Sequence, residues 1–341
     1  MMKEKKCNRG GIDVSARWLV AAVRKGAELI KKKFCNDVVG HKELIRFLRP
    51  RRNVRAQVCL EATGLYHLEA TLALDAVEIE VMVLNPRVAS DYQKACFKRA
   101  KTDPIDAAGL LDYLERQQFV AWTRPPEELL LVRQLSRRME QVKEERRAEQ
   151  CRLAAIRVLG PRARLLVADI QQSVRQCEQR LKRLQKQALA LIQADADLCQ
   201  RYELLLSVKG IAQVSAIRIL GELCLLPKDM KPAQWVAHAG LDPAPRESGQ
   251  SVHAPRHISR QGNAHLRATL YMPALVAVRF NAPVRAYYEH LLKKGKKKLV
   301  ALVAIMRKLL HCIWGMFHHM HPFDPGRFTS LNFENKHQIA A

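Results

Sequence analysis

The chain has 341 residues, which corresponds to two or three domains at roughly 150 residues per domain. Its 58 Lys and Arg against 33 Asp and Glu give a net charge of +25, and the pI is near 10.0. With 48% hydrophobic and 27% charged residues, the composition excludes an intrinsically disordered chain. A surface this basic favours a polyanionic partner, and nucleic acid is the default expectation. Ribosomal and membrane-surface proteins are basic too, so composition leaves those classes open.

The first 120 residues predict an α/β region. Segments 11–23, 54–61 and 77–84 are strand-like, and segment 104–117 has a helical pattern with a proline near its start. Strands mixed with helices over this length indicate a central sheet. The segment WTRPP at 122–126 breaks the pattern and predicts a domain boundary there.

The next 75 residues predict two long charged helices, 127–159 and a second one reaching to about 200, interrupted at Gly160 and Pro161. Apolar residues of the second helix follow a 4,3 repeat for about four heptads, at Ile170, Val174, Cys177, Leu181, Leu184, Ala188, Leu191 and Leu198. Such a seam predicts a coiled-coil hairpin that pairs with another protomer. The alternative is an amphipathic helix packed on its own domain.

From residue 201 onward the chain is predicted to be mainly helical. Segment 205–223 resembles a helix–hairpin–helix with its turn at 208–211, where Lys209 and Gly210 lie. Backbone N–H groups at such a turn grip a DNA phosphate, although a plain helical hairpin also needs a glycine there. Segment 240–262 is rich in Gly and Pro and predicts loop or short strand, and an apolar helix is expected at 299–317.

Four acids of the first domain predict a metal site. Asp13 lies in the first strand, Glu61 ends a later strand, and Asp103 and Asp106 share one helix face at i, i+3 spacing. Carboxylates that converge suit Mg²⁺, and a two-metal site suits phosphodiester chemistry. Each acid taken singly also has a structural explanation, such as a helix cap for Asp103 and a first-turn dipole contact for Asp106.

The segment 246–271, predicted as a loop that runs into a helix, combines serines with basic residues. Ser248 stands beside Gly249, and Ser251 follows closely. Glycine permits close backbone approach, arginines bind phosphate bidentately, and a serine hydroxyl can attack a phosphodiester. The nucleic-acid-binding residues expected here are Arg246, Arg256, Arg260, Asn263 and Arg267.

The remaining patterns predict no zinc site, disulfide framework or membrane span. The nine cysteines include no CxxC pair, and the histidines at 311–321 match no zinc-ligand spacing. No run approaching the roughly 18 apolar residues of a membrane span is expected. A cytosolic protein with reduced thiols is therefore predicted.

Together these motifs resemble one family, the DEDD-type transposases of bacterial insertion sequences. In that family an N-terminal RuvC-like domain is joined to a C-terminal serine-bearing domain, and the best-understood members are guided by a structured bridge RNA. The matching motifs are GID at 11–13, EATGLY at 61–66, KTDPIDA at 101–107, GLDP at 240–243, SG at 248–249 and ISRQGN at 258–263. The resemblance covers nearly the whole chain.

The resemblance implies a fold, a domain organisation and an activity. It implies a RuvC-like (RNase H-type) domain at 1–125, a coiled-coil dimerisation region at 126–200, a serine-bearing, mainly α domain with a helix–hairpin–helix-like element at 201–328, and a flexible tail at 329–341. It implies that Asp13, Glu61, Asp103 and Asp106 hold two Mg²⁺ ions and that Ser248 forms a covalent phosphoserine link to DNA. Ser251 remains an alternative nucleophile.

The implied partners are double-stranded donor and target DNA, a structured guide RNA, and further copies of the chain, as dimers that assemble into a tetramer. No membrane partner is expected, and the resemblance implies a bacterial cytoplasmic protein that is associated with the nucleoid when it is bound to DNA. The competing readings are a RuvC-type metal-dependent junction nuclease that leaves Ser248 idle, and a non-enzymatic scaffold that binds nucleic acid.

Overall fold

The computed structural model describes residues 7–50, 54–62, 64–96, 103–244, 247–248, 252–253 and 257–330. The chain divides into two compact units, Met1–Arg124 and Pro125–Ala341. Each unit has its own hydrophobic core.

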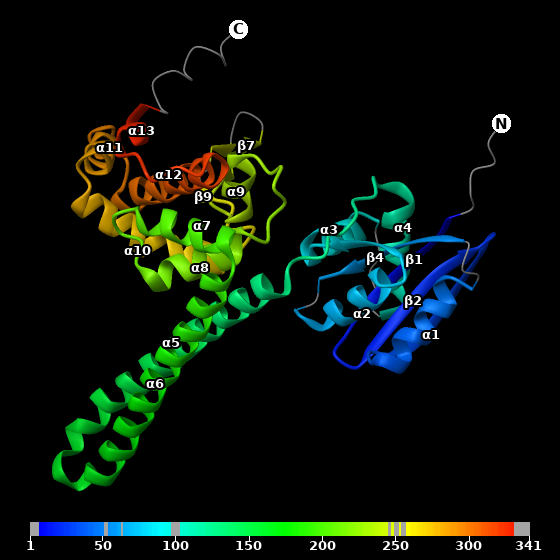
Figure 1. Ribbon diagram of the computed structural model, residues 1–341, viewed down its shortest axis with the longest axis horizontal. Helices are drawn as coiled ribbons and strands as arrows, with labels where there is room; N and C mark the ends of the chain where they lie inside the picture. The colour runs from blue at the N-terminus through cyan, green and yellow to red at the C-terminus, as the bar shows by residue number, and fades with distance from the viewer. Residues whose placement is uncertain are drawn as a thin grey trace. The chain divides into compact units, whose positions relative to one another are not determined.

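The N-terminal unit is built on a five-stranded mixed sheet (Figure 1). Its strands are β1 Cys7–Val14, β2 Trp18–Lys25, β3 Glu28–Cys35, β4 Arg55–Glu61 and β5 Glu80–Leu84, in the order β3-β2-β1-β4-β5. The first three strands pair antiparallel, and β4 and β5 run parallel to β1. This architecture confirms the predicted RNase H-like α/β fold class. The predicted segment 11–23 proved to be two strands joined by a turn.

Helices cover both faces of this sheet. On one face, α1 Val38–Leu48 and α2 Tyr66–Asp75 bury leucines against Ile12, Leu60 and other strand residues. On the other face lie α3 Pro86–Ala95 and α4 Asp103–Arg116, whose Leu110 packs near Cys59. Because side chains alternate along a strand, each strand supplies residues to both layers.

Helix α4 lies unusually close to β1, and Gly11 makes this possible. A Cβ atom on Gly11 would lie 2.1 Å from the carbonyl oxygen of Ala107 and 2.3 Å from the amide nitrogen of Leu111. The neighbouring strand β2 packs the small side chains Val20 and Ala22 against Ala107 and Leu111 of the same helix. The backbone of α4 therefore rests on the sheet where β1 lacks a side chain.

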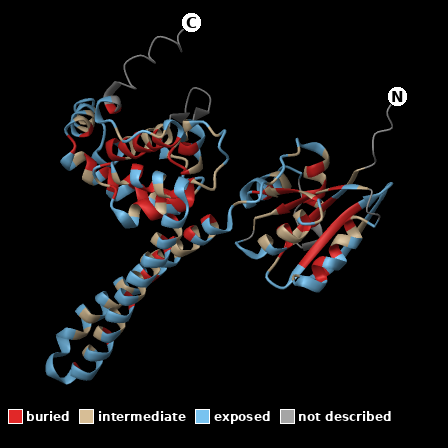
Figure 2. Ribbon diagram, viewed as in Figure 1, coloured by how far each residue is buried: buried red, intermediate tan, exposed pale blue. Residues whose placement is uncertain are grey.

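The second unit begins with the predicted helical hairpin. Helix α5 Glu127–Ile156 leads through a 3-10 turn, η1 Arg157–Ala163, into α6 Arg164–Ala194, and the two helices pack along each other. The seam residues Ile170 and Cys177 are buried, and Ala188, near the root, is part of the core of the helical body. Away from its root, most of the hairpin surface is exposed (Figure 2).

A helical body follows the hairpin. Its elements are α7 Ala196–Leu206, α8 Gln213–Leu223, α9 Pro232–His238, β6 Pro243–Ala244, β7 Glu247–Ser248, β8 Val252–His253, β9 His257–Ile258, α10 Ala264–Phe280, α11 Ala282–Lys293, α12 Lys298–His319 and α13 Pro325–Ser330. One core joins these helices to the root of the hairpin, where Leu129, Val132 and Ile192 are buried. The predicted mainly α C-terminal region is confirmed.

Helix α12 corrects the expectation that no segment is long and apolar enough to span a membrane. By length and composition Lys298–His319 meets that description, but half of its most apolar window is buried inside the protein. Ile305, Leu309 and Ile313 are fully buried in the body core. We therefore regard α12 as a core helix.

A buried carboxylate ties the hairpin to the body. Glu222 on α8 is 4% exposed. Arg137 of α5 donates two hydrogen bonds to it, at 2.8 and 3.0 Å, and Asn263 Nδ2 donates a third at 2.7 Å. Burial alone would raise the pKa of Glu222, but the hydrogen bonds from Arg137 and Asn263 outweigh burial and hold that pKa below its ordinary value.

A second carboxylate, that of Glu140, lies on α5 about one turn after Arg137. Glu140 accepts hydrogen bonds from Arg218 of α8 and from His265 of α10. Glu140 and Glu222 thus both connect the hairpin to the start of α10, through His265 and Asn263 respectively.

Substituting Gly11 with alanine should destabilise the N-terminal unit. The new methyl group would overlap the α4 backbone, which has no flexible side chain to yield there. We expect the free energy of unfolding to fall by about 3 kcal/mol in urea titrations followed by circular dichroism. Gly109→Ala in α4 is the control, because only the flexible Gln93 side chain is near it, and its effect should stay within about 1 kcal/mol. Equal effects of the two substitutions would contradict the close approach.

Replacing Glu222 with glutamine should lower the free energy of unfolding by about 2–3 kcal/mol at pH 7, because Arg137 would lose its buried partner. The folded-state pKa of Glu222 is depressed, so the stability it contributes is present above its unfolded pKa of about 4.3 and is lost as pH falls through the folded pKa. The difference between the variant and the wild type should therefore shrink in urea titrations at pH 3.5.

The control is Glu145→Gln, which breaks exposed hairpin ion pairs with Arg180 and Arg138. Its effect should stay below about 1 kcal/mol. A loss for Glu222→Gln that is the same at both pH values would argue against the charged pair.

Candidate nucleic-acid-processing site

Strand register brings two of the predicted acids together. The parallel pairing of β1 with β4 aligns Ile12 with Leu60, so Asp13 and Glu61 follow at the next position of each strand. Asp13 alternates with Ile12 and so shares the face of Gly11, on which α4 lies. Glu61 shares the face of Cys59, whose side chain packs on α4. Both carboxylates therefore belong to the α4 face of the sheet.

The other two acids belong to the start of α4. Asp103 is its first residue, and Asp106 directly precedes Ala107, the residue whose carbonyl oxygen lies over Gly11. Asp106 is half-buried, whereas the side chain of Asp103 is outside the described part of the structure. The fold thus places three of the four acids on one side of the sheet and begins the helix that carries the fourth there.

The donor chemistry of these residues fits a hard divalent cation, since Mg²⁺ prefers carboxylate oxygens. Among the side chains that the structure describes, no group of three or more His, Cys, Asp or Glu residues is close enough to hold a metal ion. Asp103 is not among those side chains. Asp13, Glu61 and Asp106 therefore offer carboxylate ligands on one side of the sheet.

The predicted nucleophile lies in a short excursion of the second unit that contains two pairs of two-residue strands. Ser248 ends β7 and pairs with Val252 of β8, while β6 pairs with β9 at the base of the same excursion. The side chain of Ser248 is not described, and Ser251, Arg246 and Arg256 lie outside the described residues. The backbone pairing places Ser248 opposite Val252, at the end of β7.

The base of this serine hairpin is fixed by the segments 240–243 and 258–263. Ser259 N–H donates to Asp242 O at 2.8 Å, and the Ser259 hydroxyl donates to the Asp242 carboxylate. Arg260 N–H donates to Gly240 O at 3.1 Å. The two segments recognised as separate sequence motifs therefore form one support for the serine.

Asn263 and Arg267, predicted to bind nucleic acid, have partners inside the protein. Asn263 caps α10 by accepting from Leu266 N–H and donates to Glu222, and Arg267 Nη1 donates to Ala239 O at 2.8 Å. Burial lowers the pKa of neighbouring His238, although the Glu222 charge acts in the opposite direction. These residues hold the end of α9 against the start of α10.

Two predicted binding residues present themselves to solvent. Lys209 is exposed in the turn between α7 and α8, and Arg260 is exposed beside the serine hairpin. Gly210 has a φ of +117°, and a Cβ atom there would lie 2.7 Å from Pro273 O of α10. The turn therefore needs glycine both for its backbone conformation and for packing on α10.

The sequence interpretation missed Glu222 and Arg137. Glu222 interrupts the apolar run LGEL, and a lone acid in an otherwise buried helix is the signal that could have identified it. Arg137 is one of many basic residues on α5 and carries no comparable signal.

Comparison with known proteins relates both units to transposases. A family model described as a transposase of DEDD IS110 type matches residues 10–159, and the model "Transposase IS116/IS110/IS902 family" matches residues 202–289. The first match contains the four acids and the second contains Ser248 and Asn263.

Individual relatives agree. The pilin gene-inverting protein of Moraxella bovis is 25% identical over 294 residues, which cover 85% of this chain and 89% of that protein. Its counterpart in Moraxella lacunata is 26% identical over a similar span. An uncharacterized 42 kDa protein of insertion element IS900 from Mycobacterium paratuberculosis is 32% identical over 27% of this chain and 23% of its own length. The chain therefore belongs to the IS110/IS116/IS900 family of transposases, enzymes that act on DNA, with a DEDD N-terminal region of RNase H type.

Proposed function

We propose that this transposase cuts and rejoins DNA at a composite site, in which the acids of the N-terminal unit act together with Ser248 of the second unit. The observation that carries the proposal is the β1–β4 register, which aligns Asp13 with Glu61 on the face covered by α4. Carboxylates on one face of a sheet, in a chain of net charge +25, are best explained by a cation that they hold in common.

In this proposal the carboxylates Asp13, Glu61, Asp103 and Asp106 hold two Mg²⁺ ions. When bound, these ions neutralise charge that develops on the phosphate oxygens. The DEDD family implies a divalent metal, and the identity and number of the ions are part of the proposal. Glu61 and Asp13 supply ligands from rigid strands, which keeps the geometry of the site fixed during the reaction.

Ser248 acts as the nucleophile. Its Oγ forms a bond to the scissile phosphorus while the bond from that phosphorus to a bridging deoxyribose oxygen breaks, and the serine proton leaves to solvent as the freed sugar oxygen takes one up. The phosphorus stays in a phosphodiester linkage, now to serine, so no bond energy is lost to hydrolysis. A DNA hydroxyl from another strand can therefore attack this phosphorus and restore the free serine. The closed base of the serine hairpin supports this role because it limits where Ser248 can move.

The basic residues would hold the nucleic acids. We propose that Lys209 with the Gly210 turn, and Arg246, Arg256 and Arg260 around the serine hairpin, contact the DNA backbone. Asn263 and Arg267 would not touch the DNA and would instead hold the segments that support the serine hairpin. The excess of 15 basic over six acidic residues between 133 and 186 supports an additional polyanion such as a structured guide RNA.

We further propose that the functional regions are 1–125, 126–200, 201–328 and a tail at 329–341, and that dimers assemble into a tetramer in which acids and serine come from different subunits. Such an enzyme would work in the bacterial cytoplasm on donor and target DNA.

Ser248→Ala should abolish the covalent protein–DNA adduct seen on denaturing gels, while leaving DNA affinity within about threefold of the wild type. Asp13→Asn and Glu61→Gln should also abolish the adduct, because the charge on the phosphate would no longer be neutralised. Chelation with EDTA should have the same effect, and added Mg²⁺ should reverse it.

Ser251→Ala is the matched control and should retain the adduct. If Ser248→Ala still cleaves DNA without any adduct, the enzyme is a metal-dependent nuclease and the serine mechanism is wrong. If Ser251→Ala alone loses the adduct, the nucleophile is Ser251.

A further inference from the structure

The face of the sheet on which α4 lies continues onto the edge strand β3. In the described part of the chain, α4 packs on β1, β2 and β4, whereas α1 packs on β3 from the opposite face. Leu29, Lys31, Lys33 and Cys35 occupy the alternate positions of β3 on the α4 side, and all four are exposed. The outer part of this face is therefore accessible to a ligand.

Cross-strand register connects this outer part with the acids. Val20 of β2 pairs with Asp13 on one side and with Lys33 on the other. Glu61 comes next to Asp13 in the same row, because β1 and β4 run in parallel register. Neighbouring strands lie about 4.8 Å apart, so the backbone of Lys33 is roughly 10 Å from that of Asp13. A lysine and two carboxylates thus share one row of the sheet.

Side-chain contacts show which lysines of β3 belong to this face. Lys33 Nζ lies 4.2 Å from the centroid of the Trp18 ring. Lys32 Nζ instead lies 5.2 Å from the ring of Phe34, which is buried on the α1 side and packs 5.5 Å from Phe47. Adjacent lysines therefore point to opposite faces of the sheet.

Trp18 is exposed at the end of the sheet where the acids lie. Its residue is 42% exposed, although it begins a strand that is otherwise largely buried. The next residue, Leu19, pairs with Val14, the last residue of β1, so Trp18 lies just beyond the carboxyl end of that strand. Lysines alone suffice to protect an edge strand from pairing with another chain. The exposed indole beside them indicates a further role.

The lysines on this face are available for an anion. Among the described residues, no ion pair includes Lys31 or Lys33, and both are exposed. Arg24, on the same face, is by contrast paired with Glu115 of α4 at 3.1 Å. Cations beside an exposed aromatic ring are the groups that bind single-stranded nucleic acid, through phosphate contacts and base stacking.

We propose that Trp18, Lys31 and Lys33 form a binding site, here called the edge site, for an unpaired DNA strand that continues from the acids. Trp18 stacks one base, and the two lysines contact phosphates. The inference rests on the proposed function, in which the acids act at the scissile phosphate. A few nucleotides span the roughly 10 Å between Asp13 and Lys33, since a strand advances by about 3.4 Å per phosphate in a duplex.

The edge site would select the state of the DNA at the cut. A base inside a duplex is stacked on its neighbours, so its face becomes available to Trp18 when the strand is unpaired. The acids would then receive DNA whose strands are already separated beside the scissile phosphate. All three residues of the edge site are exposed, so substitutions there should leave folding intact.

Photo-cross-linking tests the stacking. A thymidine oligonucleotide carrying 5-iododeoxyuridine is irradiated with the full-length protein in Ca²⁺, which carboxylates also bind, and with excess duplex DNA to occupy other basic surfaces. Peptide mass spectrometry should locate the cross-link at Trp18. Trp18→Ala should weaken binding about tenfold in fluorescence anisotropy, and Trp18→Tyr should restore it to within about threefold, because tyrosine also stacks on bases. A missing cross-link at Trp18, or unchanged affinity of Trp18→Ala, would overturn the proposal.

Salt dependence tests the phosphate contacts. Lys31→Ala and Lys33→Ala should each make the slope of log affinity against log salt shallower by about 0.7, the value for one phosphate contact with a single strand. Lys32→Ala is the matched control, because it removes the same charge from the same strand on the opposite face, and it should leave the slope unchanged. An equal change in Lys32→Ala and Lys33→Ala would show a general charge effect and overturn the edge site.

These outcomes can be told apart from those of the proposed function. Cross-linking and salt slopes are measured without cleavage, so they do not require an adduct at Ser248. A wild type that forms no adduct but cross-links at Trp18 would refute the serine mechanism and support the edge site. Adduct formation without a cross-link at Trp18 would overturn the edge site alone. Stronger cross-linking of the matching uridine RNA would overturn its assignment to DNA.

Discussion

The N-terminal unit depends on the direct contact between the backbone of α4 and β1 at Gly11. Any side chain at this position would meet Ala107 O and Leu111 N, so the helix could not rest on the sheet. Because α4 does rest there, its first turn, with Asp106, belongs to the same layer as Asp13 and Glu61. The lack of a side chain at Gly11 of β1 thus allows α4 to rest on the sheet. Side chains alternate between the two faces along β1 and β4, and this alternation places Asp13 and Glu61 on the face that α4 covers.

In the second unit, a buried charge plays a comparable part. Glu222 is buried, and its charge is stabilised by Arg137 from the hairpin and by Asn263 from the start of α10. Because Asn263 also ends the segment that closes the serine hairpin, one carboxylate connects the position of the long hairpin with the support of Ser248.

Much of the fold was predictable because its signals are local. Strand-like runs found β4 and β5, and the heptad repeat found α6. The edge strand β3 was missed because Lys31, Lys32 and Lys33 give its sequence a polar character. Phe34 is the one buried residue of this strand, so its apolar pattern is weak. Within the chain, the apolar face that follows the heptad repeat packs α6 along α5, and pairing of the hairpin with another protomer stays a prediction.

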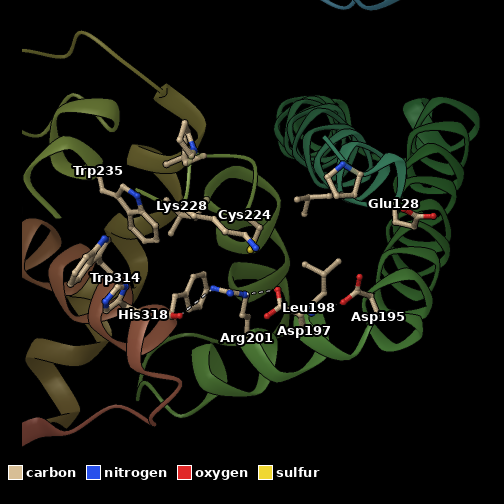
Figure 3. A pocket seen from close by; sticks show the side chains of 16 residues that line it. Glu128, Asp195, Asp197, Leu198, Arg201, Cys224, Lys228, Trp235, Trp314 and His318 are labelled. Carbon is tan, nitrogen blue, oxygen red and sulfur yellow. Dashed lines mark hydrogen bonds and ion pairs between the residues drawn. The ribbon is translucent and has the colours of Figure 1, made fainter. Parts of the chain in front are cut away.

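The candidate site was predictable in composition and less so in arrangement. The four acids and the serine were found by their motifs, but the register that aligns Asp13 with Glu61 depends on pairing between strands 40 residues apart. The roles of Asn263 and Arg267 could not be inferred, because a polar residue in a basic loop reads as a ligand contact until its internal partners are seen. The cleft of about 410 Å³ that is lined by Arg201, Trp235 and Trp314 (Figure 3) draws its walls from helices distant in sequence, so no local pattern marks it.

The central claim is that acids from one subunit and Ser248 from another form one active site. Mixing an Asp13→Asn protein with a Ser248→Ala protein, each inactive alone, tests it directly. Mixed assemblies contain one site in which both the acids and the serine are intact, and the account predicts that covalent protein–DNA adduct reappears, carried by the Asp13→Asn subunit. Absence of adduct in verified mixed assemblies would contradict a site shared between subunits.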